Sequence, residues 1–315
     1  MKERFQILSL DGGGIKGLYS AAFLANLEED LGGKIADNFD LIVGTSTGGI
    51  IALGLGIGLS PRQIVEFYYK KGPLIFRKIP FFTSLKNLLF SKYSSGDIEK
   101  IFRENDCFGG KLLGESKKRL VIPSYNIDTN EVYLFKTAHN ERFRRDYKVP
   151  AWKIARATSA APTYFPISKN VDHIRMVDGG VWANNPAMIG LFEAIAVLDV
   201  PLENVHIMSI GTTEELKQSP RMLDTFGGWP FWGKTAVELI MQAQSTGINS
   251  QLQLLLKDRY VRISHKVPDG LYGLDKMNLD KLLAFASSHS RNFSPEYKRK
   301  YQGHMAEEFV PAHRV

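Results

Sequence analysis

A serine at position 46 stands between glycines in the segment Gly44-Thr45-Ser46-Thr47-Gly48-Gly49. Apolar runs at residues 39–43 and 50–55 flank this segment, which predicts a strand, a sharp turn and a helix. Glycines at the edges of the turn suit it because they carry no Cβ atom. Such a turn exposes the serine hydroxyl near a helix N-terminus. The chemistry that this arrangement predicts is nucleophilic attack by Ser46.

A second glycine-rich turn, Asp11-Gly12-Gly13-Gly14-Ile15-Lys16-Gly17, lies between an apolar strand pattern at 5–10 and a helical pattern at 18–31. Successive glycines can aim several backbone N–H groups at one point, and serine acyl transfer needs such donors for its oxyanion. The spacing also fits a dinucleotide-binding fingerprint, which expects a carboxylate at the end of the next strand. That strand ends in Val43-Gly44-Thr45-Ser46 instead. We therefore favour an oxyanion hole formed by Gly12, Gly13 and Gly14.

Asp178 is the expected base for the serine proton. It ends a short predicted strand at 174–177, and the glycines at 179 and 180 leave its carboxylate open to a close neighbour. An aspartate has a pKa of about 3.9 in water, so it must be desolvated or isolated from other charges to act as a base. A histidine base in an α/β-hydrolase triad stays an alternative, with His206 and His265 as its candidates.

Together these segments resemble the patatin-like phospholipases. The resemblance rests on the glycine loop at 11–17, the serine turn at 44–49 and Asp178-Gly179-Gly180, and residues 157–165 also resemble the segment before the family's catalytic aspartate. It implies a lipid acyl hydrolase with a Ser46–Asp178 dyad, an acyl-enzyme, the oxyanion hole named above, and no metal or other cofactor. The family often has arginine where this chain has Lys16. The lysine keeps the positive charge but cannot make a bidentate contact. The residues expected to support the site are Lys16, Gly44, Gly48, Gly179 and Gly180.

The elements that must position these residues follow a strand–turn–helix rhythm, repeated twice in about the first fifty residues, which is typical of a parallel α/β sheet. We expect a patatin-like three-layer fold, with a mainly parallel sheet between helices, over residues 1–211. A mostly helical extension over 212–315, a candidate regulatory or oligomerisation region, is expected to pack on this core. Its expected elements are an aromatic turn at 228–233, a helix at 235–256, a strand at 260–264 and helices at 278–288 and 295–308.

An amphipathic pattern at residues 80–93 predicts a short helix with a basic polar side. Its alternatives are a lid, a membrane-docking element and a cap helix packed on the core.

The composition is that of a soluble globular protein, with 44% hydrophobic residues and a net charge of +7 from 40 basic and 33 acidic side chains. No signal peptide or membrane-spanning run is visible, and the single cysteine excludes an internal disulfide. We expect a cytoplasmic protein that contacts membranes peripherally when active, because basic surfaces attract anionic lipid headgroups. The basic clusters lack the glycine–aromatic context of RNA-binding motifs, so neither DNA nor RNA is an expected partner.

The layout of the whole chain is similar to the patatin effectors of bacterial anti-phage systems, which a cyclic oligonucleotide switches on to degrade the host membrane. This similarity implies a membrane phospholipid as substrate and a cyclic oligonucleotide as activator. The aromatic residues at 229–232 suit a nucleotide contact, an oligomer contact or a hydrophobic packing corner. The rival from another functional class is a catalytically idle patatin-fold sensor or binding module.

Overall fold

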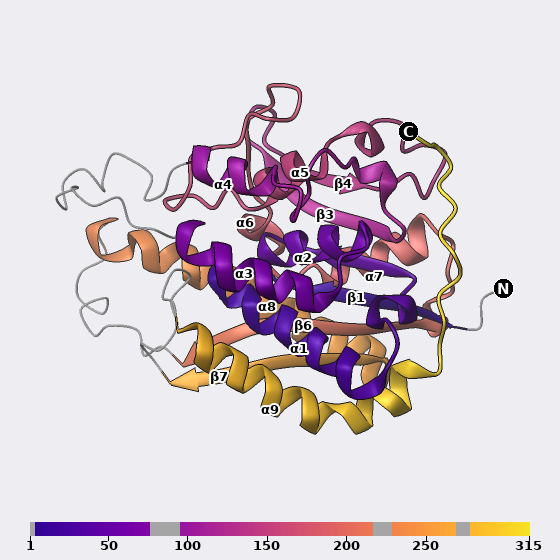
Figure 1. Cartoon of the computed structure of the whole chain (residues 1–315). Coiled ribbons are helices and arrows are strands. Elements are labelled where there is room, and N and C mark those ends of the chain that lie inside the picture. Colours follow the sequence, from indigo (N-terminus) through magenta and orange to yellow (C-terminus); the bar gives the residue numbers. More distant parts are fainter. Residues whose placement is uncertain (1–3, 76–94, 217–228, 269–277) are drawn as a thin grey trace.

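The computed structural model describes residues 4–75, 95–216, 229–268 and 278–315. These residues form a seven-stranded sheet of order β4-β3-β2-β1-β6-β7, and β5 pairs with β3 off this path (Figure 1). The neighbouring strands β3, β2, β1, β6 and β7 are parallel to one another, whereas β4 and β5 are antiparallel to β3. The expected mainly parallel sheet is therefore confirmed. The strands are β1 (Phe5–Leu10), β2 (Leu41–Gly44), β3 (Arg119–Asn126), β4 (Glu131–Lys136), β5 (Met176–Asp178), β6 (Val205–Leu216) and β7 (Tyr260–Pro268).

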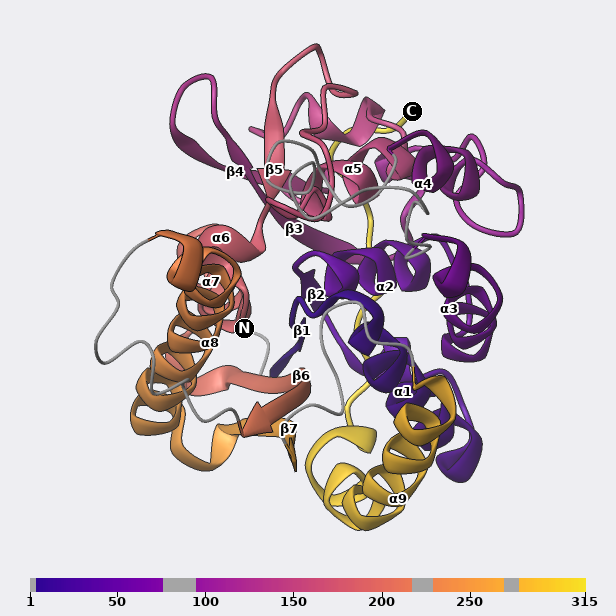
Figure 2. The ribbon, with the colours of Figure 1, turned by 90° about the vertical axis from the view of Figure 1, so that its left-hand side faces the viewer.

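Helices cover both faces of the sheet (Figure 2). All six residues of β1 are buried, as expected for a central strand of a parallel sheet. Its side chains alternate between two hydrophobic clusters, with Leu8 and Leu10 on one face and Phe5 and Ile7 on the other. The first face is covered by α1 (Gly17–Leu31), α2 (Thr47–Gly56), α3 (Pro61–Ile75) and α9 (Leu279–Tyr297), and the second by α7 (Ala187–Ala196) and α8 (Trp229–Leu256).

Smaller helices complete the layers around β3 and β5. They are α4 (Ser95–Phe102), α5 (Ala151–Thr158) and α6 (Gly180–Ala183). Of these, α5 contacts α2, β3 and β5. α5 therefore packs beside α2, the helix that follows the predicted serine, and beside β5, the strand that ends in the predicted aspartate.

The register of the strands brings three loops to one edge of the sheet. Leu10 lies opposite both Gly44 of β2 and Ile210 of β6. Because these strands are parallel, the segments that follow their carboxyl ends meet at the same edge. The glycine loop, the serine turn and the region after Ile210 are consequently neighbours, although about 200 residues of chain separate the first from the last.

The C-terminal part of the chain is more closely joined to the sheet than its composition indicates. The expected boundary at residue 211 falls inside β6, and β7 adds a further parallel strand beside it. The aromatic turn expected at 228–233 was wrong, because α8 begins at Trp229. α8 and β7 otherwise contain the helix and the strand expected at 235–256 and 260–264.

The helix expected at 278–288 lies within α9, but the separate second helix expected at 295–308 was wrong. A single helix, α9, passes Pro295 and is followed by a short π-helix at Lys298–Gln302, and no helix continues to residue 308. Aromatic contacts explain this continuity, because Phe293 packs on Phe23 and Tyr301 on Phe39. These contacts hold the chain against the core on both sides of the proline.

The amphipathic helix expected at residues 80–93 lies outside the described residues. Among the helices that the structure describes, none combines the length and the apolar character needed to cross a bilayer.

Candidate active site

Ser46 occupies a sharp turn between β2 and α2. Its backbone angles, φ 54° and ψ −120°, are unusual for a residue with a side chain, and its carbonyl accepts the N–H of Ile50 at 3.0 Å as the helix begins. The flanking glycines are required sterically. A Cβ atom at Gly44 would lie 2.2 Å from the carbonyl oxygen of Gly48, and one at Gly48 would lie 2.2 Å from that of Leu10. The expected tight turn is therefore present, and it presents Ser46 at the N-terminus of α2.

The structure brings Ser46 and Asp178 together from segments 132 residues apart. The Ser46 hydroxyl donates a hydrogen bond of 2.6 Å to Oδ2 of Asp178, and the Gly180 N–H donates one of 2.7 Å to Oδ1. Asp178 is the last residue of β5, which pairs with β3. A Cβ atom at Gly179 would lie 2.3 Å from the carbonyl oxygen of Pro123, so only glycine allows the chain to turn here.

Burial gives the Asp178 carboxyl the properties of a base near neutral pH. Only 2% of the residue is exposed, and this burial raises the pKa of Asp178 to about 7. The hydrogen bonds from Ser46 and Gly180 act in the opposite direction, because they stabilise the ionised form. A carboxyl with a pKa near the working pH can both accept and return a proton, which is what acyl transfer through a serine requires.

Thr158 at the end of α5 fixes the serine backbone. The Ser46 N–H donates to Oγ1 of Thr158 at 2.9 Å, and the Thr158 hydroxyl donates to the carbonyl of Pro123 at 2.6 Å. The carbonyl of Thr158 also accepts the N–H of Gly179 at 3.2 Å. One residue thus contacts the chain beside both members of the proposed dyad. Sequence analysis placed Thr158 in the segment 157–165 but assigned it no role, although its place in that motif was the available signal.

The glycine loop runs directly against the serine. A Cβ atom at Gly12 would lie 3.2 Å from Cβ of Ser46. The Gly12 N–H is already engaged, because it donates to the carbonyl of Asn184 at 3.0 Å. Gly13 and Gly14 line the same cavity as Ser46 and Asp178, and Gly14 has a φ of 61°, which favours glycine. Of the three predicted oxyanion donors, Gly13 and Gly14 belong to the cavity wall, whereas Gly12 does not.

Lys16 connects the glycine loop to the sheet. Its ammonium group donates to the carbonyl of Thr213 in β6 at 2.8 Å. A hydrogen bond to one carbonyl oxygen needs no bidentate donor, so a lysine can make this contact at a position where the family often has arginine.

A cavity opens beside Ser46 and Asp178. Apart from the proposed catalytic groups, its wall is mostly apolar and aromatic. A wall of this kind suits a hydrocarbon chain and offers little to a charged ligand. The helices α2, α3, α4 and α8 and the segment after α5 contribute to this wall. Their apolar residues in it include Ile50, Phe67, Ile98, Phe102, Phe165 and Met241.

The two histidines considered as alternative bases lie elsewhere. His206 pairs with Gln6 near the beginning of β6, at the amino ends of the parallel strands. His265 packs its ring against Phe285 and His289 of α9. Burial lowers the pKa of His206 to about 4 and also lowers that of His265. Neither belongs to the cavity wall in the part of the chain that the structure describes.

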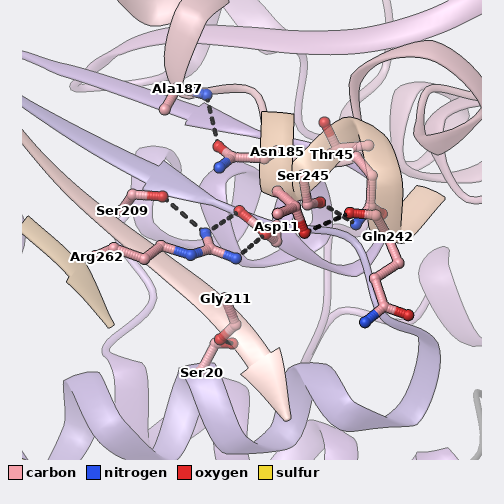
Figure 3. Close-up of polar contacts among 12 residues, drawn as sticks. Asp11, Ser20, Thr45, Asn185, Ala187, Ser209, Gly211, Gln242, Ser245 and Arg262 are labelled. Atoms are coloured by element: carbon pink, nitrogen blue, oxygen red, sulfur yellow. Dashed lines mark hydrogen bonds and ion pairs between the residues drawn. The ribbon is translucent and has the colours of Figure 1, made fainter. Parts of the chain in front are cut away.

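Polar contacts from the C-terminal part of the chain reach the active-site loops (Figure 3). The Asn184 side chain donates to Oγ of Ser245 in α8 at 2.9 Å, and Asp11 forms an ion pair with Arg262 in β7. Asn184, Ser245 and Arg262 were not among the residues predicted for the site. Nothing in the local sequence connects Arg262 with a residue 251 positions earlier.

The chain is similar to known lipid hydrolases over most of its length. The sequence model described as patatin-like phospholipase matches residues 8–191. A "cGAMP-activated phospholipase" from Pseudomonas aeruginosa is 34% identical, over 84% of this chain and 80% of its own length. Proteins of the same name from Vibrio cholerae and Escherichia coli are 34% and 33% identical, each over 85% of this chain and over 83% and 82% of their own lengths. The chain therefore belongs to the patatin-like phospholipase family and is a lipid acyl hydrolase.

Proposed function

We propose that this chain hydrolyses the acyl esters of membrane phospholipids through a dyad of Ser46 and Asp178. The observation that carries the proposal is the 2.6 Å hydrogen bond between the serine hydroxyl and a buried carboxyl group. The apolar cavity beside this pair supports a fatty acyl chain as the part of the substrate that enters the protein.

In the first half-reaction, Asp178 takes the hydroxyl proton while Oγ of Ser46 forms a bond to the ester carbonyl carbon. The carbonyl oxygen becomes an oxyanion, and the N–H groups of Gly13 and Gly14 are the proposed donors to it. The bond between the carbonyl carbon and the glycerol oxygen then breaks. Asp178 gives its proton to that oxygen, so that a lysophospholipid leaves and the acyl group stays on Ser46.

In the second half-reaction, a water molecule replaces the leaving alcohol. Asp178 accepts a proton from this water molecule while the water oxygen forms a bond to the acyl carbon. The new tetrahedral intermediate uses the same donors in the glycine loop. Its bond to Oγ breaks, the serine recovers a proton from Asp178, and the fatty acid is released.

A peripheral contact with the bilayer would deliver the substrate. Leu239 and Ile240 on α8 are 48% and 57% exposed, and the next residue, Met241, belongs to the cavity wall. Apolar side chains beside a cavity mouth can enter the acyl region of a membrane, and the net charge of +7 adds attraction to anionic headgroups.

The names of the relatives support a cyclic dinucleotide as activator, and with it a role in anti-phage defence. Three of them are called cGAMP-activated phospholipases, and their alignments cover 84–85% of this chain. We propose that cGAMP or a related cyclic oligonucleotide switches this chain on. Assembly into a homo-oligomer stays a prediction.

The test is fatty acid release from vesicles that contain phosphatidylglycerol and phosphatidylethanolamine, followed by mass spectrometry. The parent protein, Ser46→Ala and Asp178→Asn are compared with and without a panel of cyclic di- and trinucleotides. We expect fatty acid release by the parent and by neither variant. One nucleotide of the panel should raise the rate of release by the parent at least about tenfold, which corresponds to about 1.4 kcal/mol of coupling. Stimulation by none of the panel would exclude the proposed activators. Release by Ser46→Ala at the level of the parent would exclude the proposed nucleophile.

The same assay separates this function from that of an idle sensor. A patatin-fold binding module would bind a nucleotide without releasing fatty acid, whatever the residue at position 46. His265→Ala serves as the control for triad chemistry, because a triad enzyme that used this histidine would lose its activity while the proposed dyad would not.

A further inference from the structure

We propose that Arg262 is a positioning residue for the catalytic glycine loop. From the C-terminal part of the chain, it would fix and neutralise Asp11, the residue directly before Gly12, Gly13 and Gly14. This inference rests on the proposed function, in which the glycine loop donates hydrogen bonds to the oxyanion.

The contact between Arg262 and Asp11 is a buried, bidentate ion pair. Nη1 of Arg262 donates to Oδ1 of Asp11 at 2.9 Å, and Nη2 donates to Oδ2 at 2.6 Å. The side chains are only 11% and 3% exposed. Parallel N–H donors that match both carboxylate oxygens fix orientation as well as distance. Asp11 is therefore fixed in position with respect to β7.

Two neighbours in the sheet hold the guanidinium in place (Figure 3). Ser209 lies opposite Arg262 in the pairing of β6 with β7, and its hydroxyl accepts a hydrogen bond from Nη1 at 2.8 Å. A Cβ atom at Gly211 would lie 2.5 Å from Nη2, so the glycine leaves the space that the guanidinium fills. The Asp11 N–H donates to the carbonyl of Ile210 at 3.0 Å, which ties the start of the loop to the same strand.

Charge supplies a second reason for the pair. Asp11 adjoins Gly12, whose added Cβ atom would lie 3.2 Å from Cβ of Ser46. An uncompensated carboxylate on the residue next to Gly12 would oppose a second negative charge on the oxyanion, because the effect of charges on one another is large inside a protein. Arg262 cancels the charge of Asp11, so the loop can stabilise an anion.

The pair also separates the roles of two buried carboxyl groups. Asp11 is held by a cation, whereas the hydrogen bonds to Asp178 come from the neutral donors Ser46 and Gly180. Carboxyl groups in such different environments take different protonation states and different tasks. The ion pair keeps Asp11 as a fixed anion, and Asp178 remains the group that exchanges protons.

The test compares Arg262→Gln, Arg262→Lys and the double variant Asp11→Asn with Arg262→Gln. Arg259→Gln is the matched control, because Arg259 donates to the carbonyls of Leu202 and Val205, away from the loop. The readouts are kcat and KM with a short-chain p-nitrophenyl ester in the presence of cGAMP, fluorophosphonate labelling of Ser46, and circular dichroism for folding.

We expect Arg262→Gln to lower kcat by about 100-fold with KM within about threefold, because the oxyanion exists only beyond the ground state. Arg262→Lys should lose about tenfold, since an ammonium group cannot pair with both oxygens. The double variant should be about tenfold faster than Arg262→Gln alone, because it removes the unpaired charge. Arg259→Gln should stay within about threefold of the parent.

A folded Arg262→Gln variant with kcat within about threefold of the parent would overturn the inference, as would a double variant no faster than Arg262→Gln. If Arg262→Gln does not fold, Arg262→Lys decides: full parental kcat refutes the positioning role, and a loss in kcat without a change in thermal stability supports it. An inactive and unlabelled parent would instead refute the proposed function. The two failures are thus distinguishable.

Discussion

Replacing Asp178 with asparagine should stabilise the fold at neutral and alkaline pH while it stops catalysis. Burial raises the pKa of Asp178 from 3.8 to about 7, which means that the folded state disfavours the ionised carboxylate. An asparagine of the same shape carries no charge, and its oxygen can still accept the N–H of Gly180. The fold therefore disfavours the ionised form of the proposed catalytic base, as is found for other catalytic carboxyl groups in apolar sites.

The size of the effect follows from the shift in pKa. About three pKa units at about 1.4 kcal/mol each give an upper value of about 4 kcal/mol. Because the folded pKa is raised, the stabilisation from protonated Asp178 is complete below pH 3.8 and is lost as the pH rises through about 7. Between about pH 5 and pH 8, the parent should lose about 2–3 kcal/mol of unfolding free energy relative to Asp178→Asn.

Urea denaturation of both proteins at several pH values in this range measures the difference directly. Asp30→Asn, which neutralises an exposed carboxylate of α1, controls for the general effect of removing one negative charge. A difference between parent and Asp178→Asn that stays constant from pH 5 to pH 8 would show that Asp178 titrates like an ordinary carboxyl. The argument for Asp178 as a base near neutral pH would then be refuted.

Three further predictions concern the same site. Thr158→Val should cost about 1–3 kcal/mol of stability and lower kcat about tenfold, because it leaves the buried Ser46 N–H without an acceptor, whereas Thr158→Ser should recover both; parental values for Thr158→Val in urea denaturation and kinetics would contradict this. Gly48→Ala should destabilise by about 1–3 kcal/mol or more in the same denaturation assay, while Gly110→Ala, where a Cβ atom meets nothing within 4 Å, should change little. The profile of kcat against pH should rise through about pH 7 as Asp178 ionises, and His265→Ala should leave that limb in place; its loss in this variant would point to a histidine base.

Local patterns were sufficient to predict the parts of the site that lie in one turn of chain. Ser46 and the glycines beside it predict a strand, a turn and a helix, and the structure has β2 before Ser46 and α2 after it. Asp178 was also found from its neighbours, because a strand that ends in Asp-Gly-Gly leaves a carboxyl group open. Both depend on contacts between residues close in sequence, which a single sequence displays directly.

Contacts between distant segments could not be predicted in this way. Thr158 reaches Ser46 across 112 positions, and Arg262 reaches Asp11 across 251. Only the order of the strands makes them neighbours. Their residue types are also common at sites with no such role, so neither threonine nor arginine stands out in the sequence.

The errors at the C-terminal end have the same cause. Pro295 and the glycine–aromatic segment after residue 227 were interpreted as interruptions, because proline and glycine usually end helices. In the structure, tertiary packing of Phe293 and Tyr301 on the core outweighs this preference, and α9 continues past the proline. Propensity is a weak guide where aromatic side chains on both sides pack against the core.

The most direct test of the Ser46–Asp178 dyad is the rate and position of labelling by a fluorophosphonate probe, mapped by peptide mass spectrometry. We predict one adduct, at Ser46, with labelling slowed at least about 100-fold in Asp178→Asn and within about threefold of the parent in His206→Ala and His265→Ala. An adduct at another residue would contradict the account, as would labelling of Asp178→Asn at the parental rate.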